Sequence, residues 1–252
     1  MIVEYLVRGV KAGVVAGVVF GLLLALVANP VLGYADAIGH EDGTHDHEES
    51  STAHSNSWLS LPDGISVVSG VLWGVLLGAV GFGLAYYFLE PVVPGSGSAK
   101  SYVFATAGFL TVSGAPWLAV PPAPPGTVHT LGVQTRFLLY GGMMITGAVA
   151  VVASMLLYGR LHANSDLSTP SAVAGGLVPM AVLLAAAAVL PADQTVVTLP
   201  TTLAEGVVGL TMFGQVLMWA TLAVVHARLS DESVRDSTAT ADGRVGHSAG
   251  GD

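Results

Sequence analysis

The sequence predicts an all-α protein, a polytopic bundle of about six transmembrane helices in the cell membrane. Hydrophobic residues make up 52% of the chain and charged residues only 10%, whereas soluble domains carry about 25% charged residues because their surface must face water. The charges also lie between long apolar runs. Six of these runs reach the roughly 20 residues that a helix needs to cross a bilayer.

The six runs follow one another with one long gap, between the first and the second. We predict spans at Val7–Val27, Ile65–Leu89, Tyr102–Val120, Phe137–Tyr158, Ser171–Leu190 and Leu203–Val225. Gly114 and Pro116 interrupt the third run, which makes it the weakest. Pro179 lies inside the fifth, where neighbouring helices can satisfy the backbone groups that it frees. The transmembrane domain then covers residues 1–229, and the Ser/Thr/Gly/Asp-rich residues 230–252 are expected to form a disordered cytoplasmic tail.

Basic residues indicate the orientation. With six spans, the bases next to the spans fall on one side, except for Arg136; they are Arg8, Lys11, Lys100, Arg160 and Arg228. Bases favour the cytoplasmic side, so both termini are predicted to be cytoplasmic. No Lys or Arg occurs between Ala12 and Ala99, which places the loop of residues 28–64 outside. Arg136 is the single base on the external half.

The first run has two interpretations. Its basic start, apolar stretch and Gly33-Tyr34-Ala35 fit a signal peptide with a small-residue cleavage site. The run is long for a signal peptide, however, and it carries four glycines at a strict spacing of four residues: Gly9, Gly13, Gly17 and Gly21. Such a face allows close helix packing, which favours a retained helix.

The second run repeats this spacing with Gly70, Gly74 and Gly78. The two glycine faces are suited to pack against each other, or each against a partner subunit such as a second copy of the chain. Glycine is common in membrane helices, and we favour general membrane packing over a specific pairing of the two runs.

The external loop is rich in metal-ligand side chains. Four of the eight His and six acids lie between Asp36 and His54. The candidate ligands are His40, Glu41, Asp42, His45, Asp46, His47, Glu48 and His54. Imidazole and carboxylate bind divalent transition ions where thiolate is absent, and this chain has no Cys. His45 and His47 fall on the same side of an extended segment.

The loop also has a simpler interpretation, as an acidic solvated segment whose His residues are incidental. The density of His favours metal contact. Its Gly, Ser and Thr residues favour a flexible collector over a preformed cage, because ordering the loop costs entropy.

Two charged side chains on the external half form a second candidate. Charges inside membranes usually pair within the bundle, so we hypothesise an ion pair between Arg136 and Glu205. Alternatively, Thr202 and Glu205 form a capping box at a helix start, and Arg136 extends to the headgroups.

Two segments resemble the CbtA family of predicted cobalt transporter subunits. The first is the His/acid tract followed by Trp58-Leu-Ser-Leu-Pro-Asp-Gly64. The second is Pro116, the stretch Pro121-Pro-Ala-Pro-Pro-Gly126, and then Thr130-Leu131 with Arg136 and Tyr140. The resemblance implies cobalt uptake, a small one-helix partner subunit and a link to cobalamin supply. Val128 and His129 replace an acidic pair of the family, and we expect His129 to be the substitute metal ligand there.

The preferred interpretation is a membrane subunit of a cobalt, nickel or zinc uptake system, with the lipid bilayer and the divalent ion as partners and no permanently bound cofactor. The residues do not choose the metal, since cobalt ranks low in intrinsic affinity. A non-transporting metal sensor or scaffold is the alternative, because few polar groups lie at membrane depth. Walker, Rossmann and Gly-x-Ser-x-Gly patterns are absent, so no enzyme is predicted. The net charge of −9 argues against nucleic acid.

Overall fold

A computed structural model describes residues 2–34, 61–124, 126–164, 168–190, 193, 195–197 and 199–248, with the backbone alone for residues 61–64 and 233–248. The helices are α1 (Ile2–Leu23), α3 (Leu61–Leu76), α4 (Tyr86–Leu89), α5 (Ala99–Phe109), α6 (Ala115–Trp117), α7 (Val133–His162), α8 (Thr169–Gly176), α9 (Val178–Ala187) and α10 (Thr201–Ser248). Three π-helical segments continue helices without a break: η1 (Leu24–Ala28), η2 (Leu77–Ala85) and η3 (Leu110–Gly114). Two short strands, β1 (Val128–His129) and β2 (Thr195–Val196), pair antiparallel.

Helices long and apolar enough to cross a membrane dominate the fold. In the described ranges there are five: Ile2–Tyr34, Ile65–Leu89, Val133–His162, Thr169–Ala187 and Thr201–Glu232. The prediction of a multi-pass, all-α membrane protein is confirmed at this level.

Five of the six predicted spans are among these candidates, and the third run is the exception. It forms α5, η3 and α6 in sequence, and this stretch is not among the five candidates. Polar residues lower the mean hydropathy of this stretch, and two of them face inward. Ser101 is fully buried and Ser113 is 2% exposed. A central position among other helices lets this stretch carry hydroxyl groups that lipid would not tolerate.

Proline divides the fifth predicted span. α8 ends at Gly176 and α9 begins at Val178, with Pro179 in its first turn. Proline lacks the N–H that would continue the hydrogen-bond ladder and favours the start of a helix. The span is therefore two short helices placed end to end.

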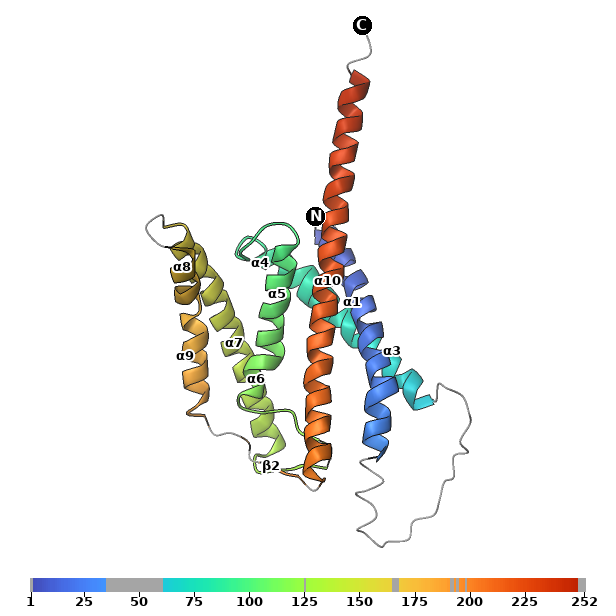
Figure 1. The fold of residues 1–252 in the computed structure, drawn as a ribbon, viewed down its shortest axis with the longest axis vertical. Helices are drawn as coiled ribbons and strands as arrows, with labels where there is room; N and C mark the ends of the chain where they lie inside the picture. The colour runs from blue at the N-terminus through green and yellow to red at the C-terminus, as the bar shows by residue number, and fades with distance from the viewer. Residues whose placement is uncertain are drawn as a thin grey trace.

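The helices pack in a row. α1 lies between α3 and α10, α10 also contacts α5, and α7 joins η3 and α6 to α8 and α9. Figure 1 shows the start of α1, the α4–α5 connection and the α7–α8 connection toward one end. The end of α9, β2 and the start of α10 lie toward the other, which we call the ladder end because it carries the paired strands. Successive connections thus lie at opposite ends of the bundle, as the predicted orientation requires. Which end is cytoplasmic stays a prediction.

The two glycine faces pack against each other, so the preference for general packing was wrong. Their register is antiparallel, with the pairs Gly9–Gly78, Gly13–Gly74 and Gly17–Gly70. A Cβ added at Gly17 would lie 2.5 Å from the Gly70 carbonyl oxygen, and one at Gly21 would lie 2.7 Å from the Val67 Cα. Side chains here would force the backbones apart. The faces are thus filled within one chain, and α1 is an integral part of the bundle.

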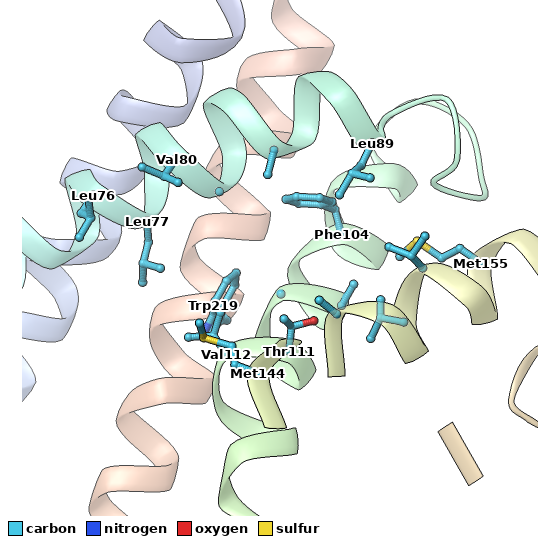
Figure 2. A pocket seen from close by; sticks show the side chains of 17 residues that line it. Leu76, Leu77, Val80, Leu89, Phe104, Thr111, Val112, Met144, Met155 and Trp219 are labelled. Atoms are coloured by element: carbon cyan, nitrogen blue, oxygen red, sulfur yellow. The ribbon is translucent and has the colours of Figure 1, made fainter. Parts of the chain in front are cut away.

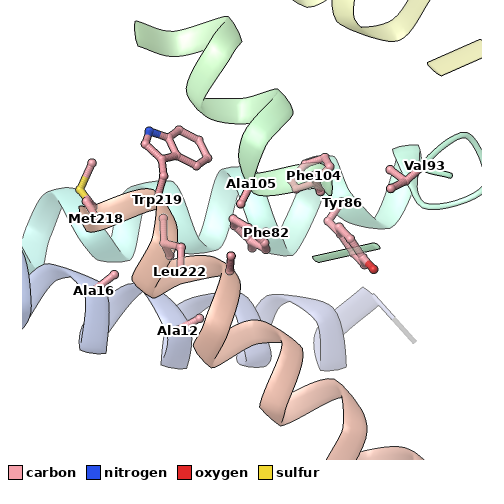
Figure 3. Close-up of a cluster of buried hydrophobic side chains, with 11 residues drawn as sticks. Ala12, Ala16, Phe82, Tyr86, Val93, Phe104, Ala105, Met218, Trp219 and Leu222 are labelled. Atoms are coloured by element: carbon pink, nitrogen blue, oxygen red, sulfur yellow. The ribbon is translucent and has the colours of Figure 1, made fainter. Parts of the chain in front are cut away.

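A buried apolar cluster fixes α10 against this pair (Figure 3). Phe82 of η2 and Phe104 of α5 meet edge to face, with ring centroids 5.2 Å apart. Leu222 of α10 is fully buried beside them. Gly108 of α5 leaves room for the Trp219 indole, which a Cβ there would strike. Since lipid is as apolar as these side chains, dispersion from close fit holds such helices together.

The last helix extends beyond the predicted sixth span. α10 continues to Ser248, and the disorder of a cytoplasmic tail over residues 230–252 stays a prediction. No proline follows Pro200 in the sequence, so nothing interrupts the hydrogen-bond ladder in these residues.

Candidate functional site

Most of the predicted metal ligands lie outside the described residues. These are His40, Glu41, Asp42, His45, Asp46, His47, Glu48 and His54, which all fall within residues 35–60. The helices on either side of this segment end at Tyr34 and begin again at Leu61. Figure 1 shows α1 running down to the ladder end.

At the ladder end, His129 forms a pair with an acid that the sequence did not indicate. The His129 Nδ1 lies 2.6 Å from the Asp193 Oδ2. His129 belongs to β1, where it pairs with Thr195 of β2. The ladder thereby brings two loops that are 64 residues apart into one unit.

Asp193 is enclosed by hydrogen-bond donors. Its side chain is 1% exposed, and its Oδ1 accepts bonds from the Leu131 amide at 3.1 Å and the Thr130 hydroxyl at 3.3 Å. Its own amide donates to the Ala119 carbonyl at 3.3 Å, which ties it to the end of the α5–α6 stretch. A carboxylate held at so many points has a fixed orientation.

These donors also set the ionisation of Asp193. Burial raises the pKa of its carboxyl, but the Leu131 amide, His129 and the Thr130 hydroxyl lower the pKa by more, and the net shift is downward. Hydrogen bonds to the charged form favour that form. Asp193 is therefore an anion at neutral pH.

The His129 ring keeps one nitrogen available. Its side chain is 19% exposed, and within the described residues its ring bonds only through Nδ1, to Asp193. A carboxylate at Nδ1 favours the tautomer with the proton on Nδ1, which leaves a lone pair on Nε2. The pair presents one oriented nitrogen ligand at the ladder end.

The hypothesised ion pair between Arg136 and Glu205 is not formed. Neither residue takes part in the ion pairs of the described chain. Glu205 is exposed and lines an open cavity of about 480 Å³ between the Pro122–Pro124 segment and α10. The Arg136 Nε is buried without a hydrogen-bond partner. The predicted capping box is not at the helix start either. α10 begins at Thr201, so Thr202 lies inside the helix and not at its N-cap.

Tyr140 has a structural role. Its hydroxyl donates to the Val112 carbonyl of η3 at 2.8 Å. A π-helical turn disturbs the regular hydrogen-bond ladder and frees backbone groups. Tyr140 satisfies one of them and joins α7 to the central stretch.

Two polar pairs lie along the seam where the α5–η3 stretch meets α10. The Ser113 hydroxyl donates to the Gln215 Oε1 at 3.4 Å, and the Ser101 Oγ lies 2.9 Å from the His226 Nδ1. Between these pairs, the Trp219 indole packs against Gly108. The Trp219 Nε1 is buried without a hydrogen-bond partner, as is the His226 Nε2. The seam is thus the place where polar groups reach membrane depth.

Sequence reasoning missed His226, which falls on the predicted cytoplasmic side. It is fully buried and packs against the rings of both Phe82 and Tyr86, with centroids 4.9 Å and 4.8 Å away. Its spacing of eleven residues from Gln215 puts both on one helix face. That spacing is the only signal that pointed to it.

A second cavity lies beside the seam, and its lining is unsuited to binding an ion (Figure 2). It has a volume of about 490 Å³ and lies between η2, the α5–η3 stretch, α7 and α10. Its lining is apolar apart from the Thr111 hydroxyl, with Met144, Met155 and Trp219 among the larger side chains. It suits hydrocarbon, not a hydrated cation.

A preformed cage of ligands is not found in the described ranges. There, no three His or acidic side chains gather closely enough to hold a metal ion. The pair of His129 and Asp193 is the nearest approach to such a group at the ladder end.

Comparison with known proteins identifies the family. The model of the family described as "Probable cobalt transporter subunit (CbtA)" matches residues 2–231. Neither the curated proteins nor the solved structures provide a match. The matched region includes the glycine-packed pair, the His/acid tract, the ladder and the seam. The chain belongs to the CbtA family of probable cobalt transporter subunits.

Proposed function

We propose that this chain is the membrane subunit of a divalent metal uptake system, with cobalt as the ion and the His/acid-rich segment between Asp36 and His54 as an external collector. The observation that supports the proposal is one of placement. The helix that precedes this segment, Ile2–Tyr34, runs to the end of the bundle where the ladder holds His129 and Asp193. An ion that the collector binds would then be delivered to the fixed imidazole of His129.

The collector acts through charge and transient ligation. Six acids between Asp36 and His54 attract a divalent cation, and a field of one sign raises its local concentration. Neutral imidazoles then exchange with water in the hydration shell of the ion. Because many weak ligands compete, the ion is released easily to the next site.

The seam between the α5–η3 stretch and α10 is the proposed route through the membrane. It starts at Ser113 and Gln215 and ends at Ser101 and His226. Trp219 lies between them as an apolar barrier. Buried polar atoms without partners are costly unless water or an ion visits them. The His226 Nε2 is such an atom and can meet either, whereas the Trp219 Nε1–H is a donor that can bind only water or another acceptor.

Radiolabelled cobalt uptake tests the collector. Cells expressing the chain with its system partners are compared with cells expressing a variant in which His40, His45, His47 and His54 are changed to Ala. We expect the cobalt concentration for half-maximal uptake to rise, because the variant keeps the six acids that attract the ion but loses the imidazoles that ligate it. The control changes His162 and His247, both on the predicted cytoplasmic side, and leaves uptake unchanged.

Two outcomes would contradict the proposal. Identical uptake in the loop variant and the parent would remove the collector role. Absence of uptake with every combination of partners would favour the alternative, a membrane sensor or scaffold that binds the ion without moving it.

A further inference from the structure

The pair at the ladder end has the arrangement of a metal-binding histidine and its orienting carboxylate. In such sites a His binds the ion with one nitrogen and donates the other N–H to a carboxylate, which fixes the ring and raises its basicity. Here the His129 Nδ1 lies 2.6 Å from the Asp193 Oδ2, and the Nε2 makes no hydrogen bond within the described residues.

Each partner has the accessibility that this role requires. Asp193, at 1% exposure, is shielded and held by the Leu131 amide and the Thr130 hydroxyl. His129, at 19%, still reaches solvent. An ion can therefore approach the imidazole without competing for the carboxylate, which is already occupied.

A purely structural role is the alternative. A buried carboxylate that ties together β1, β2 and the end of the α5–α6 stretch would stabilise the ladder end without any metal. That role needs a donor at position 129 but no free nitrogen. An amide side chain at position 129 would serve this structural role equally well but could not replace the ring nitrogen as a metal ligand. A substitution of His129 by Gln therefore separates the two roles.

We propose that His129 Nε2 is a fixed divalent-metal ligand on the bundle and that Asp193 is its positioning residue. The inference deepens the proposed function and rests on it, because it names the first fixed site that an incoming ion meets. Water completes the coordination sphere of an ion such as Co²⁺, Ni²⁺ or Zn²⁺.

The test uses the full chain, purified in a membrane mimic, with His40, His45, His47 and His54 changed to Ala so that the loop contributes no imidazole. Co²⁺ is added, and its visible absorption and paramagnetically shifted imidazole resonances are recorded. We expect a shifted, slowly exchanging Nδ1–H resonance, because Asp193 protects that proton.

Three substitutions in this background assign the site. His129→Gln keeps a donor for Asp193 but removes the aromatic nitrogen, and we expect the Co²⁺ signal to disappear while thermal stability is kept. Asp193→Asn should weaken Co²⁺ binding by about 10- to 100-fold, the usual effect of losing such a carboxylate, and should speed exchange of the Nδ1–H. His162→Ala is the matched control and should change neither.

Co²⁺ binding that survives His129→Gln unchanged would overturn the inference and leave a structural pair. So would the absence of any imidazole signal in the starting background. The proposed function is tested separately by uptake: a chain that binds Co²⁺ through His129 but moves none would keep this inference and lose the transport proposal.

Discussion

Gly17 and Gly70 face each other so closely that a Cβ added at Gly17 would lie 2.5 Å from the Gly70 carbonyl oxygen. The same holds at the neighbouring pairs along the two helices. α1 and the α3–η2 helix therefore behave as one two-helix unit, and the rest of the bundle is built on it. α10 packs against this unit and carries the polar side chains of the seam.

Enlarging Gly17 should weaken the bundle. We expect Gly17→Ala to lower the free energy of unfolding by about 1–3 kcal/mol, the typical cost of forcing extra volume into a packed interface. Thermal unfolding in detergent measures the change. Gly142→Ala in α7 is the control, since nothing lies within 4 Å of a Cβ there, and an equal loss in both variants would contradict this account.

The buried pair of Ser101 and His226 should contribute to stability. Ser101→Ala leaves the His226 Nδ1 without its partner at 2.9 Å, and polar contacts between membrane helices are worth about 0.6 kcal/mol on average, with a maximum near 1.7. We expect a loss within this range in a folding assay. Thr106→Ala is a suitable comparison, because the exposed Thr106 hydroxyl bonds only to its own helix and its removal should cost less.

The hydroxyl of Tyr140 should contribute to the stability of η3. Tyr140→Phe keeps the packing but leaves the Val112 carbonyl without its donor at 2.8 Å. A buried acceptor left unpaired costs about 1–3 kcal/mol. Hydrogen exchange of the amides in η3 should become faster in this variant, and unchanged exchange would show that the π-helical segment does not depend on Tyr140.

Acid should remove the contribution of Asp193. Its pKa in the folded chain is lower than the ordinary value of 3.8, so its stabilising effect is complete above that value and is lost as the pH falls through the lower, folded pKa. We expect the stability difference between the parent chain and Asp193→Asn to shrink as the pH falls below about 4. A difference that grows below that pH would reverse the assigned sign.

The sequence predicted what depends on periodicity and composition, and it missed what depends on contact. Apolar length predicted the spans, and four-residue spacing predicted glycine faces on two helices. Spacing alone does not say which faces meet, so the pairing of Gly13 with Gly74 needed the structure. The third run is less apolar than the other five, and the central position that lets it carry Ser101 and Ser113 is a tertiary property.

The candidate site shows the same division. His129 was named from its place beside Thr130, but Asp193 lies 64 residues away in a short link without any motif. Only the strand ladder brings the two together. Glu205 and Arg136 were paired on depth alone, and depth does not specify which way two side chains point. The His/acid loop stays a prediction, because it lies outside the described residues.

Cobalt accumulation in matched cells tests the central claim most directly. Cells lacking other cobalt uptake are supplied with the system partners alone, with the partners and this chain, or with the partners and a chain carrying the loop substitutions together with His129→Gln. We predict accumulation of radiolabelled cobalt that depends on the intact chain and is strongly reduced in the combined variant. Equal accumulation with and without the chain, at equal expression of the partners, would contradict its assignment as a transport subunit.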